Sequence, residues 1–323
     1  MNRSLWKKNL AEGGFLLLAL MIGAACFAWF RVNVVGELDT TSFRRIVDLV
    51  PKSWLKFASV DLEWLISYSG RTGLTLDEPF LIMMFAIWAI VRGSDVVSGE
   101  ISRGTMEMLL AQPVSRRRVF LVQVTSTILG LAILCLVTWL AMWLAVHTTS
   151  VKVAAEPEST IWSLPTALLA GGNREVEAVD KPMSDFVNAA DFVPGVVSLF
   201  ALASFVAGFT TLLSSLDRFR WRTLGIAAGI YLVAAMIKIL ALASSTFSWA
   251  HWLSFFSLYE PEVAVKASCE APEQLWQFWR YGDEGAWEGF GILAQNVILL
   301  GGAFICLIIA CRIFERRDIP QPL

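Results

Sequence analysis

The chain has 323 residues, of which 56% are hydrophobic and 17% are charged, and its formal net charge is −2. A soluble protein carries about 25% charged residues, so this composition and the mean hydropathy of +0.60 exclude an ordinary soluble domain. The near-neutral charge lacks the strong basic excess of a nucleic-acid-binding domain, and we expect no nucleic-acid partner.

Six apolar runs approach or exceed the length of about 20 residues that a helix needs to cross a bilayer. The predicted spans are 13–30, 79–91, 119–146, 192–216, 223–245 and 290–311. We therefore expect an all-α polytopic membrane protein with six transmembrane helices in a single domain, 1–323. The first run follows a basic start, like a secretory signal. Its core is long for a signal, and no convincing cleavage site follows, which favours an uncleaved span.

The segments between the spans alternate in charge. The predicted outer loops are 31–78, 147–191 and 246–289, and the predicted inner segments after the N-terminus are 92–118, 217–222 and 312–323. The inner side holds fourteen basic and seven acidic residues, whereas the outer loops hold eleven basic and twenty-one acidic residues. Because basic residues are retained on the cytoplasmic side, both termini are expected to be cytoplasmic. We expect a bacterial plasma (inner) membrane location.

The second span, 79–91, is short for a bilayer. Thirteen residues of helix rise only about 20 Å, against a hydrocarbon core of about 30 Å. The run can still cross if Asp77 and Glu78 lie among the outer headgroups while Arg92 snorkels inward. Without this span the three arginines 116–118 would lie outside, so the span is retained.

The first outer loop contains an amphipathic pattern over 43–58, with Pro51 in its middle. Apolar residues recur there at helical spacing and basic residues take the other face. Such a helix either lies flat at the outer membrane interface or packs on other loops of the same protein. Both alternatives remain open from the sequence.

The third outer loop carries aromatic residues at a helical spacing that ends before Pro261. They are Trp252, Phe255, Phe256 and Tyr259. Most of the fourteen tryptophans of the chain lie near span ends or in outer loops, as in the aromatic belts of membrane proteins. Anchoring at the interface is therefore favoured over an aromatic ligand-binding surface.

Lys238 lies within the outer half of the fifth span. An intramembrane charge usually faces the protein or water and marks a functional site, but a lysine this close to the span end can also snorkel to the outer headgroups. In the same span Gly225 and Gly229 share a helix face, which permits close contact with another helix. Both interpretations of Lys238 stay open.

Several kinds of site are disfavoured by the residues present. Only one of the five cysteines, Cys269, lies in an outer loop, so no disulfide framework is expected. Two histidines without neighbouring cysteine pairs argue against a dedicated metal site. The chain also has no nucleotide-binding motif of the form GxxxxGK[ST] and no HExxH or GxSxG motif. Any energy source must come from another polypeptide or from an ion gradient.

The inner segment after the second span is unusually structured for a basic loop. Its spacing predicts a short helix that stops before Pro113, with Val97, Ile101 and Met108 on one face. Glu100 and Arg103 are three residues apart and can pair.

Two glycines and a serine in this inner segment also carry structural information. Gly99 and Gly104 each weaken a helix by about 1 kcal/mol, which makes sense if the backbone turns there or approaches another surface. Ser115 is positioned to cap the third span. A plain basic loop would explain Arg116–Arg118, through attraction to anionic lipid, but not the remaining pattern.

The order of residues in this segment resembles that of a known family. The residues that carry the resemblance are Glu100, Gly104, Thr105, Leu109, Leu110, Pro113, Ser115 and Arg116. The pattern is similar to the cytoplasmic loop after the second span in permeases of ATP-binding cassette (ABC) transporters of the type-2 exporter class. The six spans, the internal N-terminus and the long first outer loop extend the resemblance over most of the chain.

This resemblance implies a non-catalytic permease without a cofactor of its own. A second copy of the chain or a homologue would complete the permease pair. Residues near 98–112 would form a coupling helix that docks into a separate ABC ATP-binding subunit carrying ATP and Mg²⁺. Glu100 and Arg103 would be candidate contacts, and Gly104 and Thr105 would allow close approach.

Two alternatives to transport remain open from the sequence. The first is an ABC-type membrane scaffold that transmits mechanical work to an extracytoplasmic partner, for which the large outer loops leave room. The second is a polytopic membrane enzyme, which would need reactive groups facing a cavity. Membrane lipid is a partner in each of these cases.

Overall fold

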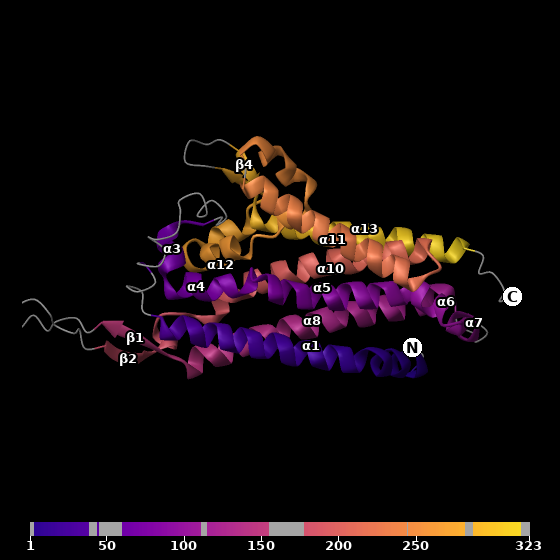
Figure 1. Ribbon diagram of the computed structural model, residues 1–323, viewed down its shortest axis with the longest axis horizontal. Coiled ribbons are helices and arrows are strands. Elements are labelled where there is room, and N and C mark those ends of the chain that lie inside the picture. Colours follow the sequence, from indigo (N-terminus) through magenta and orange to yellow (C-terminus); the bar gives the residue numbers. More distant parts are fainter. Residues whose placement is uncertain are drawn as a thin grey trace, which may run out of the picture.

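The computed structural model describes residues 3–38, 44, 60–110, 115–154, 178–243, 245–281 and 287–317. The amphipathic pattern at 43–58 lies, except for residue 44, outside the described residues, and so does Pro113. Within these ranges the protein is a bundle of long helices whose two described termini lie at the same end (Figure 1). We call this end the terminal end.

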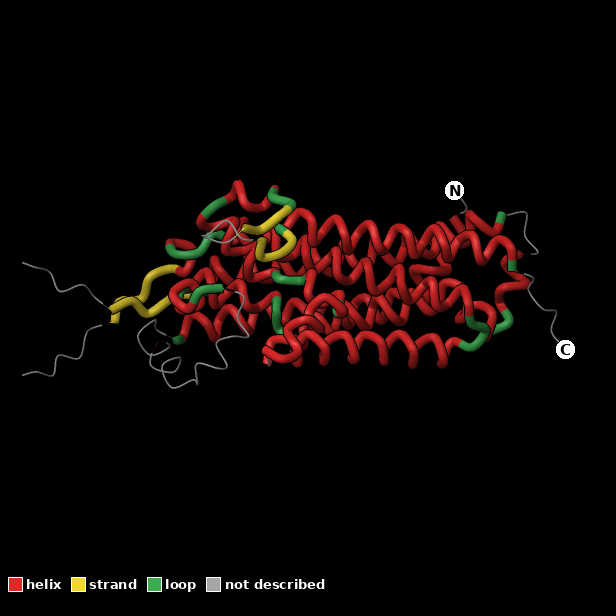
Figure 2. The backbone as a smooth tube through the Cα atoms, turned by 90° about the horizontal axis from the view of Figure 1, so that it is seen from above, coloured by secondary structure: helices red, strands yellow, loops and turns green. Residues whose placement is uncertain are grey.

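Six helical stretches of the described chain are long and apolar enough to cross a membrane, which confirms the predicted all-α polytopic class. Four of them are dominated by the single helices α1 (Arg3–Glu37), α8 (Arg116–Thr148), α11 (Arg220–Ala243) and α13 (Ile292–Arg316). A fifth combines η6 (Ala189–Phe192) with α10 (Val193–Leu216). The long helices run along the longest axis of the molecule, with all described strands near one end, which we call the strand end (Figure 2).

The remaining stretch, Tyr68–Ser102, contains the short apolar run predicted as the second span. It consists of α4 (Tyr68–Gly73), η2 (Leu74–Leu76), α5 (Pro79–Ser94), the π-helix η3 (Asp95–Gly99) and α6 (Glu100–Ser102). The stretch has 35 residues, so its helical turns continue past both ends of the run 79–91. Arg92 is only 4% exposed, which corrects the expectation that it snorkels into the inner headgroups.

The helix α10 forms the centre of the bundle and packs against α13, α5, α8 and α11. Small residues permit this close packing: a Cβ at Gly208 would lie 2.8 Å from the carbonyl oxygen of Ala303 on α13. The helix α11 is peripheral, because only 17% of its 18-residue apolar segment is buried. A Cβ added at Gly225 or at Gly229 would have no atom within 4 Å, so the predicted close contact is not made within the described part of this chain.

The strand end carries two small antiparallel ribbons and several short helices. The ribbons pair β1 (Ser150–Ala154) with β2 (Ala178–Pro182), and β3 (Trp279–Tyr281) with β4 (Trp287–Phe290). The short helices are α3 (Leu62–Ile66), η5 (Met183–Asp185), η7 (Ser245–Leu253), η8 (Phe255–Leu258), α12 (Pro261–Glu270) and η9 (Pro272–Trp276).

The aromatic pattern before Pro261 does not form one α-helix, which corrects the prediction. Two 3₁₀ helices, η7 and η8, meet at Ser254, whose hydroxyl accepts a hydrogen bond from the Phe256 amide at 3.2 Å. This local capping interrupts the helix. The aromatic residues therefore separate: Tyr259 is fully buried, whereas Trp252 is 54% exposed.

Candidate functional site

The helix of the second span changes its winding just before the predicted coupling segment. In η3 the turn is widened to a π-helix, which disturbs the regular hydrogen bonds of the backbone. A side chain of α10 compensates for this change. The Ser214 hydroxyl accepts from the amides of Val97 and Ser98 at 3.2 and 2.9 Å and donates to the Ser94 carbonyl at 2.8 Å.

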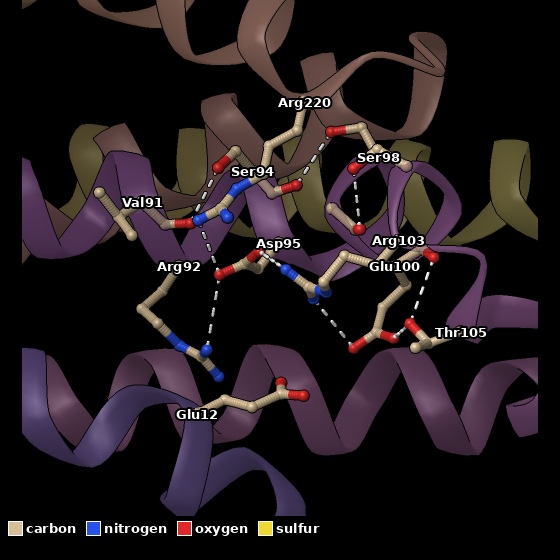
Figure 3. A network of polar contacts seen from close by, with 12 residues as sticks. Glu12, Val91, Arg92, Ser94, Asp95, Ser98, Glu100, Arg103, Thr105 and Arg220 are labelled. Atoms are coloured by element: carbon tan, nitrogen blue, oxygen red, sulfur yellow. Dashed lines mark hydrogen bonds and ion pairs between the residues drawn. The ribbon is translucent and has the colours of Figure 1, made fainter.

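The widened turn places Asp95 among three arginines, as Figure 3 shows. Its carboxylate lies 2.8 Å from Arg103 Nη1, 3.1 Å from Arg220 Nη2 and 3.7 Å from Arg92 Nη1. The Asp95 side chain is 13% exposed. Because Arg220 belongs to α11 and Arg92 to α5, this carboxylate joins both spans to the segment after α6.

Glu100 is the second carboxylate of the network, and its side chain is only 1% exposed. It accepts hydrogen bonds from Lys8 of α1 at 2.8 Å, from Gln123 of α8 at 3.1 Å and from the Thr105 hydroxyl. Thr105 begins the short helix α7 (Thr105–Leu110). Glu100 therefore ties α6 and α7 to the first and third spans.

Arg103 bridges the two carboxylates. Its guanidinium lies 3.4 Å from Glu100 Oε1 in addition to its contact with Asp95, so the predicted pairing of Glu100 with Arg103 is present. Partial burial alone would lower the pKa of Arg103, but the two carboxylates raise it above the ordinary value of an arginine. Arg103 consequently keeps its charge.

Gly104 ends α6 with a backbone φ of +69°, in the left-handed region that favours glycine. The turn required by this glycine breaks the predicted continuous helix and changes which residues face inward. Met106 is 1% exposed and packs against Phe120 and Phe314, whereas Met108 is 72% exposed. The expectation that Met108 shares the face of Val97 is therefore wrong.

The other predicted residues of the segment lie at its end and at the start of α8. Leu109 and Leu110 are the last two residues of α7. Ser115 occupies the N-cap position of α8, although its side chain makes no capping hydrogen bond. Arg116 donates to the Arg317 carbonyl at 2.7 Å, beyond the end of α13, and Arg117 pairs with Glu315. These arginines thus bind the last turn of α13.

Lys238 is not part of this network. Its ammonium donates to the backbone carbonyl of Tyr259 at 2.9 Å, on the strand-end side of α11.

The sequence grouped the residues of 100–105 correctly but did not reveal four partners, namely Lys8, Asp95, Gln123 and Arg220. An acidic residue inside a strongly basic inner segment was the available signal for Asp95. The other partners lie 23 to 125 positions away from the residues that they contact, and a single sequence carries no signal of such contacts.

The chemistry of the site is that of an attachment point. Two carboxylates are surrounded by Lys8 and three arginines, and no group of three or more His, Cys, Asp or Glu residues in the described ranges could hold a metal ion. Charge-assisted hydrogen bonds of this kind fix the relative position of helices. The arrangement connects a short segment with an exposed face, α6–α7, to four of the spans.

A family model described as ABC-2 family transporter protein matches residues 11–319 of the chain. A search of the curated proteins finds no match. The match covers all six long helical stretches and the network described above, apart from the first residues of α1. The chain therefore belongs to the ABC-2 transporter family, as a multi-pass membrane permease subunit.

Proposed function

We propose that this chain is the permease subunit of an ATP-driven exporter, and that α6–α7 is the segment through which an ATP-binding subunit moves the spans. The observation that carries the proposal is the buried Glu100, which holds this segment on α1 and α8 while Met108 remains 72% exposed on α7. A force applied to the exposed side would reach the spans through the buried side.

Glu100 acts from within the chain in this proposal rather than as a direct contact with the ATP-binding subunit, because only 1% of its side chain is exposed. Arg103, with 35% of its side chain exposed, can both bind the two carboxylates and face a partner. Gly104 gives the turn between α6 and α7. ATP and Mg²⁺ belong to the partner subunit, since the chain has no phosphate-binding loop.

The terminal end faces the cytoplasm in the proposed orientation. This orientation follows from the excess of basic residues in the segments that lie on the same side of the membrane as the N-terminus. A second copy of the chain, or a homologue, completes the permease in the inner membrane. The peripheral α11, with an exposed apolar face, leaves area for such pairing or for lipid.

Site-specific photocrosslinking in native membranes tests the proposal. A photoreactive residue at Met108 should form an adduct with a protein that contains a phosphate-binding loop, identified by mass spectrometry. The same residue at Val233, which is 55% exposed on α11, is the matched control and should give no such adduct. Adducts with an extracytoplasmic protein from Met108, or with the ATP-binding subunit from Val233 alone, would contradict the proposal.

The complex recovered in this way allows a functional measurement. The purified permease alone should hydrolyse no ATP, and the complex should lose substrate-linked stimulation of hydrolysis when Glu100 is replaced by alanine. Retained stimulation in a complex that still assembles would mean that ATP hydrolysis is coupled to the spans through another segment.

A further inference from the structure

A second feature lies along the second and fifth spans and ends at the strand end. A cavity of about 630 Å³ lies between α5 and α11, and its walls are almost entirely apolar. The wall residues that line its length include Met83, Ala86, Ile90, Ala228, Tyr231 and Ala235. We call this cavity the α5–α11 groove.

The groove opens sideways from the bundle, toward the region that a bilayer would occupy. Met83, Leu232 and Ile239 line it and are 46%, 60% and 59% exposed. From Leu224 to Lys238, both lining residues, α11 rises about 21 Å at 1.5 Å per residue. This length is a large part of the hydrocarbon core of about 30 Å.

The strand-end limit of the groove is charged. Asp77, Lys238 and Glu262 all line it there. Glu262, the second residue of α12, is 3% exposed, and its Oε2 atom is buried without a hydrogen-bond partner in the described part of the chain. A buried carboxylate oxygen without a donor is unfavourable, so each such atom needs an explanation.

Lys238 does not supply the missing donor in this arrangement. Its Nζ atom donates to the Tyr259 carbonyl at 2.9 Å and lies 6.0 Å from the centre of the Tyr259 ring. The Tyr259 hydroxyl in turn donates to the Leu76 carbonyl at 2.5 Å. Two carboxyl groups therefore face the groove with one ammonium, which leaves an excess of acceptors at its end.

We propose that the α5–α11 groove binds an amphiphile with a hydrocarbon chain and a primary ammonium in its headgroup. The hydrocarbon chain lies between α5 and α11, and the ammonium donates to Glu262 Oε2 and to Asp77. An anionic group in the same headgroup pairs with Lys238, whose ammonium has three N–H groups and uses one of them for the Tyr259 carbonyl. A zwitterionic aminophospholipid satisfies all of these requirements.

Titration of Glu262 is consistent with this arrangement. Burial, and then the Asp77 carboxyl, raise the pKa of Glu262 to about 7. The charged groups that face it are Asp77, Lys238 of α11 and Glu260, which is itself paired with Arg280 at 3.1 Å. An ammonium binds the ionised carboxylate more strongly than the neutral acid, so binding should strengthen as the pH rises through about 7.

Lipid retention by the purified chain tests the proposal without an ATP-binding subunit. The chain in a neutral detergent is exposed at pH 8 to phosphatidylethanolamine or to phosphatidylglycerol with the same acyl chains, and bound lipid is counted by native mass spectrometry. Phosphatidylethanolamine should be retained about tenfold better, as expected for a hydrogen bond between charged groups. Free ethanolamine, which has the headgroup amine but no tail, should not compete.

Three variants sharpen this test. Glu262→Gln should abolish the preference for phosphatidylethanolamine, and Ala235→Trp should reduce retention of both lipids by filling the groove. Glu273→Gln is the control, because Glu273 is an exposed carboxylate of η9 outside the groove. An equal retention of both lipids by the unmodified chain would overturn the proposal, and so would an unchanged preference in Glu262→Gln.

The competing occupant is a second copy of the chain. Cysteine at Leu232 should then form a disulfide-linked dimer that excludes lipid, a result that would also overturn the proposal. None of these measurements involves α6–α7. Failure of lipid binding would therefore leave the proposed coupling function unaffected, and failure of the Met108 crosslink would leave the groove unaffected.

Discussion

Removal of the Glu100 carboxylate is the most direct test of how α6–α7 is held. In Glu100→Ala the contacts to Lys8, Gln123 and Thr105 are lost together. Breaking a buried ion pair by removing one partner costs about 3–5 kcal/mol. We take about 3 kcal/mol, because the Lys8 and Arg103 side chains are 28% and 35% exposed and can recover solvent.

An energy of about 3 kcal/mol corresponds to a change of about a hundredfold in the equilibrium between attached and detached α7, at 1.4 kcal/mol per factor of ten. Amide hydrogen exchange measures such local opening. The amides of Thr105–Leu110 should exchange about a hundredfold faster in Glu100→Ala, while those in the middle of α10 should be unchanged.

Glu12→Ala provides the matched control for this measurement. Glu12 also approaches Lys8, at 3.7 Å, but its side chain is 35% exposed and makes no hydrogen bond or ion pair to α6 or α7 in the described part of the chain. Its removal should leave exchange in α7 unaltered. Equal exchange in Glu100→Ala and in the unmodified chain would refute the reasoning, since α7 would then be held by Met106 and its apolar neighbours alone.

Three further outcomes are expected. Gly104→Ala should destabilise the turn by about 1 kcal/mol, because φ is +69° there. The effect is one of backbone conformation alone, since no atom lies within 4 Å of the added Cβ. Gly225→Ala is equally unobstructed but helical and should not destabilise, and thermal unfolding of the two purified variants compares them. Gly104→Asn should recover part of the loss, and a loss equal to that of Gly104→Ala would contradict the backbone explanation. Partial burial of the thiol, and then the Asp191 carboxylate that it contacts at 3.6 Å, raise the pKa of Cys269 to about 12. Its alkylation by iodoacetamide should therefore be slow at pH 8 and rise about tenfold per pH unit up to pH 10, in contrast to that of the variant Glu273→Cys.

The six spans could be predicted from the sequence because membrane insertion depends on apolar length, which hydropathy reads directly. The full extent of the second helical stretch could not. Arg92, Asp95 and Glu100 are all charged, and their charges end the apolar run when hydropathy is followed along the sequence. In the folded chain Arg92 pairs with Asp95, and Glu100 pairs with Lys8 and Arg103, so the helix continues through these charges, which only three-dimensional proximity reveals.

The candidate site divides in the same way. The spacing of Glu100, Arg103 and Gly104 indicated a structured segment, because helix pairing and glycine turns are local effects. The inward face of α7 could not be assigned, since a positive φ at Gly104 exchanges Met106 for Met108. The distant partner Lys8 belongs to a different span, and a single sequence carries no measure of such a distance.

The π-helix at Asp95–Gly99 has a consequence for how this region tolerates changes in length. Each residue of an α-helix corresponds to a rotation of about 100°. A π-helical turn, with hydrogen bonds between residues i and i+5, takes up one residue more than an α-helical turn at nearly the same total rotation. Loss of one residue from Asp95–Gly99, with return to regular winding, would therefore leave the angular position of Glu100 nearly unchanged. Loss of one residue from the α-helical part of the stretch would instead rotate Glu100 by about 100°, away from Lys8 and Gln123. The widened turn thus accommodates one additional residue between the second span and α6–α7, and a deletion within it should be tolerated better than a deletion elsewhere in α5.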